Sequence, residues 1–418
     1  MVNVVAADRR APLGVYGCAT AFTIAQYVSV VVIPLYLARE GLGPVVLGAV
    51  ASIPGLFMLL LRVPAGYLTD RRGARPVTAL AVGSMAAGGA LLLAAAFRWL
   101  PPLGAVVVAQ AMFGTGRAAF WPAIRTYLTW WNHGTRAGRF GMLNVVEGIG
   151  SVAGPAVTGV LFAAAGPVGA AWLLLLLGVA GCLGAWIMPE LGAPSAAAGL
   201  VKGVAGTGDD APVGDAVSVW RLRPVYVAAA CDLGAALVMI SLSSFLPVYL
   251  LAVGLSESMV GLLTSVRGLA LAVAGPMYDR VFGRSSYQAP WLVGMGLTGL
   301  GHLLVPAFAH PAPLIGAIGL MGLGGGLLQV LGSMVVAEFT PQERLGLAMA
   351  FSGMFRSAAA FVVPAALGFA VNALGLASAF LMPAAPLVAA AAGSGPLLRW
   401  GMAQQADAVP SSAPARPG

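Results

Sequence analysis

Six charged side chains lie deep inside long apolar stretches of this 418-residue chain. They are two acids and four arginines: Arg62, Arg117, Glu147, Asp232, Arg267 and Arg356. Burying a charge costs free energy, so a charge in such surroundings is usually paired or serves a function. A buried carboxylate can take up and release a proton, and a buried guanidinium can hold that carboxylate in place. These residue types therefore suit proton exchange and ion pairing.

Each of these charges belongs to an apolar run of about 20 residues, the length that crosses a bilayer as a helix. Twelve such runs occur, at residues 14–36, 45–68, 76–97, 103–128, 139–164, 168–188, 224–250, 258–278, 290–309, 312–336, 345–372 and 374–398. We therefore predict an all-α membrane protein with twelve transmembrane helices in two pseudo-symmetric six-helix halves. The halves are residues 1–190 and 223–400, joined by a Gly- and Ala-rich cytoplasmic linker (191–222) and followed by a disordered cytoplasmic tail (401–418).

The composition excludes a water-soluble fold. Apolar residues make up 59% of the chain and charged residues 9%, whereas about 25% is usual in soluble domains. The net charge of +8 reflects topology, because most Lys and Arg residues lie on the side of the chain termini and only Arg39 and Arg98 on the other. The positive-inside rule then predicts a multi-pass protein of the inner or plasma membrane with both termini in the cytoplasm, and no nucleic-acid partner.

The sequence repeats between its halves. Gly66, Asp70 and Arg71 recur 209 residues later as Gly275, Asp279 and Arg280. Pro155 and Gly159 recur as Pro364 and Gly368 at the same offset. Parallel six-helix repeats of this kind occur in secondary transporters, which hold their substrate at the repeat interface near the middle of the membrane.

The repeated segment GYLTDRRGARP, residues 66–76, resembles the cytoplasmic signature of the major facilitator superfamily. The residues that carry the resemblance are Gly66, Asp70, Arg71, Gly73 and Arg75, with Asp279 and Arg280 in the second copy. Gly66 is suited to close helix contact, and Asp70 can interact with a neighbouring helix N-terminus. In that family the motif controls conformation and does not select substrate.

The fifth predicted helix resembles the motif of drug:proton antiporters within this superfamily, with Thr158 where a glycine is usual. Its residues are Gly141, Gly150, Gly154, Pro155 and Gly159. Small residues at such spacing let helices approach closely, and we expect Gly154 to face a helix of the other half. The resemblance favours export, although generic glycine packing would produce a similar pattern.

The resemblance implies alternating access, with the first, fourth, seventh and tenth helices lining a cavity. The wall residues implied are Gln26, Tyr27, Arg117, Trp121, Asp232, Gln329 and Ser333. The fourth helix departs from the family pattern, because Gln110 stands where antiporters commonly have an arginine. We therefore expect that role, if it is kept, to have moved to Arg117.

The two buried acids are the candidates for proton coupling. Asp232 has no partner on its own helix and is the predicted proton carrier. Glu147 has a potential cationic partner in Arg117 or Arg267 and is the predicted state-dependent ion-pair residue, and Arg356 is a further ion-pair candidate. Two plainer interpretations stay open: a structural Glu147–Arg117 pair, and an Asp232 that lies at a helix end.

The function these features favour is proton-coupled efflux of a small amphipathic organic molecule by a monomer. Import or facilitated diffusion of a metabolite is the alternative, and a membrane sensor or enzyme on the same fold is a second one. The sequence contains no Ser/His/Asp or Cys/His arrangement, no P-loop and no zinc-ligand spacing. We therefore predict that the protein is not an enzyme and requires no cofactor or metal.

Overall fold

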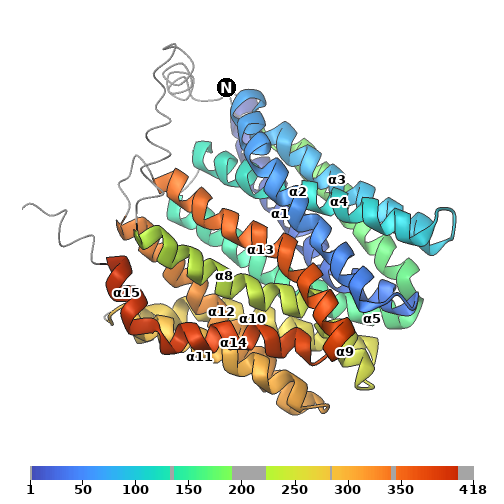
Figure 1. The fold of residues 1–418 in the computed structure, drawn as a ribbon. Coiled ribbons are helices and arrows are strands. Elements are labelled where there is room, and N and C mark those ends of the chain that lie inside the picture. Colours follow the sequence, from blue (N-terminus) through green and yellow to red (C-terminus); the bar gives the residue numbers. More distant parts are fainter. Residues whose placement is uncertain (1, 132–135, 191–222, 283–284, 340–344, 403–418) are drawn as a thin grey trace, which may run out of the picture.

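The computed structural model describes residues 2–131, 136–190, 223–282, 285–339 and 345–402, and these form a bundle of long helices (Figure 1). The predicted linker 191–222 lies outside the described residues, as does the predicted tail 401–418 except for Gly401 and Met402, which are helical. The first half contains α1 (Val2–Arg39), α2 (Pro44–Arg72), α3 (Ala74–Ala96), α4 (Pro102–Trp130) and α5 (Arg136–Ile187). No strand occurs in the described ranges.

The second half repeats this plan with more interruptions. Its elements are α8 (Arg223–Ser244), α9 (Leu246–Ala252), α10 (Glu257–Phe282), α11 (Gln288–Leu304), the short η1 (Val305–Ala307), α12 (Pro311–Phe339), α13 (Leu345–Leu374), α14 (Ser378–Ala392) and α15 (Ser394–Met402). The predicted spans 224–250 and 374–398 each become two consecutive helices, α8 with α9 and α14 with α15.

All twelve predicted spans are largely helical, which confirms the all-α membrane fold. Nine helices of the described residues are long and apolar enough to cross a membrane by themselves. The helix α5 accounts for two predicted spans, 139–164 and 168–188, and is broken only at Gly166, with φ 62° and ψ −157°. The start predicted at 374 is wrong, because α13 continues to Leu374 and a turn with Gly375 at φ 86° follows.

The helices run alternately between two ends of the bundle (Figure 1). We call the end where α1 begins and α15 finishes the proximal end, and the end where α1 stops at Arg39 the distal end. Within the first half, α1 packs on α5, and α3 packs on both α4 and α5. The halves meet along two helix pairs, α2 with α13 and α5 with α10, which the internal repeat relates to each other.

Large apolar side chains cover the outside of the bundle. Val63, Trp99 and Trp186 are 76%, 74% and 74% exposed. Such exposure would be unfavourable in water over so large an area, but it suits contact with lipid tails. The burial pattern therefore agrees with a multi-pass membrane protein.

Candidate functional site

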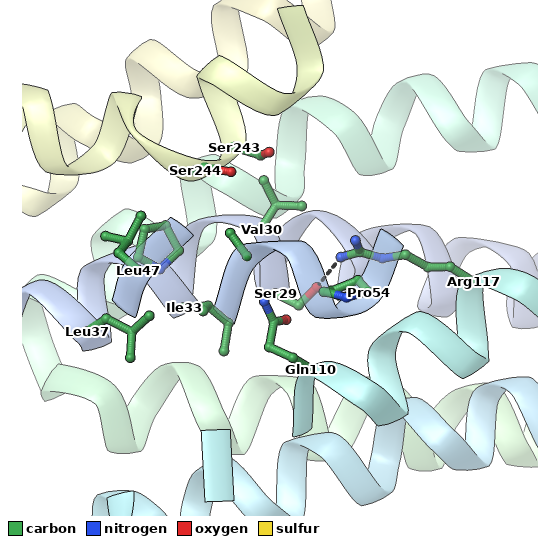
Figure 2. Close-up of a pocket in the computed structure, with 12 residues that line it drawn as sticks. Ser29, Val30, Ile33, Leu37, Leu47, Pro54, Gln110, Arg117, Ser243 and Ser244 are labelled. Carbon is green, nitrogen blue, oxygen red and sulfur yellow. Dashed lines mark hydrogen bonds between the residues drawn. The ribbon is translucent and has the colours of Figure 1, made fainter. Parts of the chain in front are cut away.

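A small pocket lies between the two halves, towards the distal end, where α1 and α8 end and α2 begins (Figure 2). Its lining residues come from α1, α2, α4 and α8: Ser29, Val30, Ile33, Pro34, Leu37, Leu47, Ala51, Pro54, Gln110, Arg117, Ser243 and Ser244. Its cavity volume of about 40 Å³ has room for a few water molecules and not for an organic ligand. Any larger ligand therefore requires this region to open.

Arg117 is the charged side chain of this pocket and is directed at α1 (Figure 2). Its Nη2 donates to the Ser29 hydroxyl at 2.7 Å and to the Gln26 carbonyl at 3.2 Å. Both acceptors are neutral. The Nε of Arg117 is buried and has no acceptor among the described residues. The sequence reasoning missed Ser29, although it lies one helical turn after Gln26 on the same face.

One face of α4 extends this polar network towards the proximal end. Trp121 follows Arg117 by four residues, and its indole Nε1 donates to the Gln26 side-chain oxygen at 3.2 Å. Arg125, four residues further on, lies over the Trp121 ring at 5.7 Å from its centroid. The face predicted from the i, i+4 spacing of α4 is therefore one continuous surface of cations and an aromatic ring.

Asp232 and Arg356 form a direct ion pair between α8 and α13. Asp232 is buried, and the Nε of Arg356 is buried without an acceptor among the described residues. Sequence alone could only show that Asp232 has no partner on its own helix. The partner comes from a helix 124 residues later in the chain, so Asp232 does not lie free at a helix end.

Glu147 on α5 is surrounded by arginines without a direct ion pair to any described residue. The cations that interact with it electrostatically are Arg125, Arg267 and Arg356, from α4, α10 and α13. Of the two partners expected for Glu147, Arg267 acts on it electrostatically, whereas Arg117 turns to the carbonyl and hydroxyl groups of α1. Arg267 also acts electrostatically on Tyr27 of α1.

Arg62 joins the halves from α2. Its Nη1 lies 3.4 Å from both the Gly353 carbonyl and the Ser357 hydroxyl of α13. Arg356, Arg125 and Asp232 act on it electrostatically. We call the seven residues Arg62, Arg117, Arg125, Glu147, Asp232, Arg267 and Arg356 the central charge cluster. The structure thus brings together charges that lie on six different helices.

The glycines of the α5 motif serve two different contacts. A Cβ at Gly150 or Gly154 would lie 2.6 Å from Thr23 Oγ1 or 2.7 Å from Tyr27 Cβ, both on α1. The expected cross-half role of Gly154 is therefore wrong: it permits packing inside the first half. Gly159 makes the cross-half contact, since its Cβ would lie 2.8 Å from the Cα of Gly261 on α10.

The remaining motif residues differ in their surroundings. Pro155 lies within α5, and its carbonyl faces Gly261 of the other half. A Cβ added at Gly141 would have no atom within 4 Å, so this glycine makes no close helix contact in this conformation.

The segment 66–76 forms the proximal turn between α2 and α3. Gly73 has a φ of 90°, which a side chain would strain. Arg75 bonds Glu190 at 2.9 Å and the Trp186 carbonyl at 2.9 Å, which ties the start of α3 to the end of α5. Arg71 lies over the Tyr67 ring, 4.5 Å from its centroid. The side chain of Asp70 lies outside the described part of the chain.

Among the described residues, no helix makes the close contact expected at Gly66. A Cβ at Gly66 or at its repeat Gly275 would meet no atom of the described part of the chain within 4 Å. Asp279 and Arg280 are exposed at the proximal end of α10. Neither glycine of the two motif copies therefore makes a close contact with the described part of the opposite half.

Of the predicted wall residues, Arg117 lines the pocket and the others do not. Ser333 is exposed and donates to the Gln329 carbonyl at 2.9 Å, within α12. Ser243 and Ser244, which the sequence reasoning missed, line the pocket at the junction of α8 and α9.

Within the described ranges, no group of three His, Cys, Asp or Glu residues could hold a metal ion.

Sequence and structure comparisons identify the class of protein. The Major Facilitator Superfamily profile matches residues 15–256 and 231–416, so the chain belongs to this superfamily. No curated protein matches the chain. Similar solved structures include a bacterial homologue of the human lysosomal transporter Spinster in an inward-facing and occupied conformation, with 14% identity, TM-score 0.71, and 96% and 98% of the two chains covered.

Two further solved structures have the same fold. A D-xylose-proton symporter is 13% identical, with TM-score 0.71 over 92% of this chain and 97% of that one. A POT family transporter in complex with 5-aminolevulinic acid is 14% identical, with TM-score 0.68 over 92% and 96%. At these identities the likeness concerns the fold, which is that of a multi-pass transporter of this superfamily.

Proposed function

We propose that the protein is a secondary active transporter that exports a small amphipathic organic molecule in exchange for protons. The observation that carries the proposal is the position of Glu147. This acid of the first half interacts with Arg267 and Arg356 of the second half, and it has no direct ion pair with a described residue. Its protonation would remove an attraction between the halves, which links proton binding to their relative position.

The two acids then have different roles from those expected from sequence. Asp232 forms a direct ion pair with Arg356, whereas Glu147 has no direct ion pair with a described residue. We assign the exchangeable proton to Glu147. Asp232 holds Arg356 in place. Arg356 is in turn one of the positive charges of the second half that attract Glu147.

Direction and topology complete the proposal. The Lys and Arg bias supports cytoplasmic termini in an inner or plasma membrane, and the glycine motif of α5 supports export. The proximal end is then cytoplasmic. The protein acts as a monomer in this proposal, because each half already supplies the other's contact surface through α2, α13, α5 and α10.

The test is transport in inverted membrane vesicles under an imposed pH gradient. A panel of amphipathic compounds is offered in the presence and absence of the gradient, with vesicles lacking the protein as the control. Gradient-dependent accumulation in the vesicle lumen supports export. Compound movement that does not depend on the pH gradient would favour facilitated diffusion. Gradient-driven movement of the compound in the opposite direction would favour import together with protons.

A further inference from the structure

The central charge cluster has an excess of positive charge. It contains five arginines (Arg62, Arg117, Arg125, Arg267 and Arg356) and two acids (Glu147 and Asp232). Among the described residues, Asp232 forms one direct ion pair, with Arg356. Arg125 is exposed near the proximal end of α4, and the other four arginines leave two unbalanced positive charges inside the bundle even with Glu147 ionised.

In the described part of the chain, several N–H groups of these arginines donate to neutral acceptors, and others have no acceptor. Arg117 donates to a carbonyl and a hydroxyl group, and Arg62 does the same on α13. The Nε atoms of Arg117 and Arg356 are buried without an acceptor in the described part of the chain. A buried guanidinium forms its strongest hydrogen bonds with an oxyanion, and without a counter-charge it costs free energy.

Two of these arginines approach one place from opposite halves. Arg117 of α4 and Arg267 of α10 both act electrostatically on Tyr27, and Arg117 also lines the inter-half pocket. Trp121 and Tyr27 provide aromatic surface beside them. An anion bound between Arg117 and Arg267 would attract one arginine of each half and so connect the halves. The apolar part of the same molecule could contact the aromatic rings.

We infer that the transported molecule is a small organic anion whose carboxylate or phosphate group binds between Arg117 and Arg267. This inference rests on the proposed function and narrows its substrate class. It predicts that affinity falls with increasing ionic strength, because screening weakens the attraction of the unpaired arginines for the anion. It also predicts that positively charged analogues are excluded.

The experiment measures ligand binding without any gradient. The purified protein, in a neutral detergent, is heated with matched sets of compounds: indole-3-acetate, indole-3-acetamide and tryptamine, the corresponding phenyl and alkyl series, phenyl phosphate, and inorganic phosphate. We expect the organic anions to raise the unfolding temperature in a concentration- and salt-dependent way. Phenyl phosphate and the carboxylates separate the two oxyanion classes, and inorganic phosphate tests whether the apolar part is needed.

Arginine variants locate the binding site. Arg117→Gln and Arg267→Gln should each weaken anion binding by at least about tenfold, since each removes a charged hydrogen-bond donor. Arg117→Lys should keep the preference for anions, and Arg399→Gln, an exposed arginine of α15, should bind as the unmodified protein does. Size-exclusion chromatography checks that each variant is folded.

Three outcomes would overturn the inference: no stabilisation by any organic anion, equal stabilisation by the amides or amines, or unchanged anion affinity in both glutamine variants. Different results would contradict the proposed function. Anion binding without gradient-driven movement would contradict transport by proton exchange, whereas gradient-driven movement of amines without anion binding would contradict only the inferred substrate class.

Discussion

At the residue scale, partners decide what each buried charge can do. Asp232 and Glu147 both lie inside apolar helices, and their local sequences do not distinguish them. The structure distinguishes them. Asp232 forms a direct ion pair with Arg356, whereas Glu147 interacts electrostatically with three arginines that are farther away. The same type of side chain is thus an ion-pair partner in one place and the proposed proton carrier in the other.

Glu147→Gln and Asp232→Asn should therefore separate coupling from stability. Glu147→Gln should abolish movement driven by a pH gradient and leave downhill substrate exchange, because the amide cannot titrate. Asp232→Asn should instead lower stability by about 1–3 kcal/mol, with part of the loss relieved by water at Arg356, whose side chain is 38% exposed. Vesicle transport and thermal unfolding measure the two effects.

A double variant tests the Asp232–Arg356 pair itself. Asp232→Asn combined with Arg356→Gln should lose less stability than the sum of the single variants, because the double variant leaves neither charge unpaired. Strict additivity would contradict the pair. Full coupling in Glu147→Gln together with uncoupling in Asp232→Asn would reverse the roles of the two acids.

At the element scale, helices of opposite halves approach through small residues at the distal end. A Cβ at Gly48 on α2 would overlap the Pro364 carbonyl of α13, and one at Gly159 on α5 would lie 2.5 Å from the Glu257 carbonyl. Two hydrogen bonds accompany these contacts: Ser265 donates to the Val152 carbonyl at 2.7 Å, and the Ala365 amide donates to Ser52 at 3.0 Å. Backbones this close leave no room for side chains.

Gly159→Leu should block this approach and reduce transport strongly, because α5 and α10 could no longer reach the distal contact. Gly141→Leu on the same helix is the matched control, since its Cβ position faces open space. Transport activity per folded protein, with abundance measured by immunoblot, compares the two. Similar activity of both variants would show that the distal contact does not limit the transport cycle.

At the scale of the whole molecule, the close cross-half contacts of the described residues lie from the distal end to the middle of the bundle. The cross-half contacts of α2 run from Gly48 to Arg62, and those of α5 from Gly159 to Ser151. Gly66 and Gly275, nearer the proximal end, face open space. The largest apolar cluster includes residues of both halves, whereas two further clusters lie within the second half alone.

Thiol labelling should detect this asymmetry. In a background without Cys18, Cys182 and Cys231, a reagent should modify Gly66→Cys and Gly275→Cys quickly. Ser52→Cys and Ser265→Cys should be protected, because both serines are buried in the distal contact, at 4% and 7% exposure. Rapid labelling of the serine positions with protection of the glycine positions would show the opposite conformation in the membrane.

The sequence by itself determined the membrane class, the helical spans and the division into two repeated halves. Apolar runs long enough for the bilayer leave the backbone few alternatives to helix, and these runs are local features of the chain. The repeat of Gly66, Asp70 and Arg71 at a constant offset also needs no coordinates. The family resemblance carried by these residues agrees with the superfamily match.

Only the tertiary structure decided which groups meet. Helix periodicity shows which residues share a face, but the rotation and neighbours of each helix depend on packing across the whole bundle. Gly154 and Gly159 are five residues apart, yet one contacts α1 and the other α10. Asp232 likewise gains Arg356 from a distant segment, and Arg117 turns to α1 instead of Glu147. Contacts between residues about 100 or more positions apart are set by the assembled helices, because no local spacing encodes them.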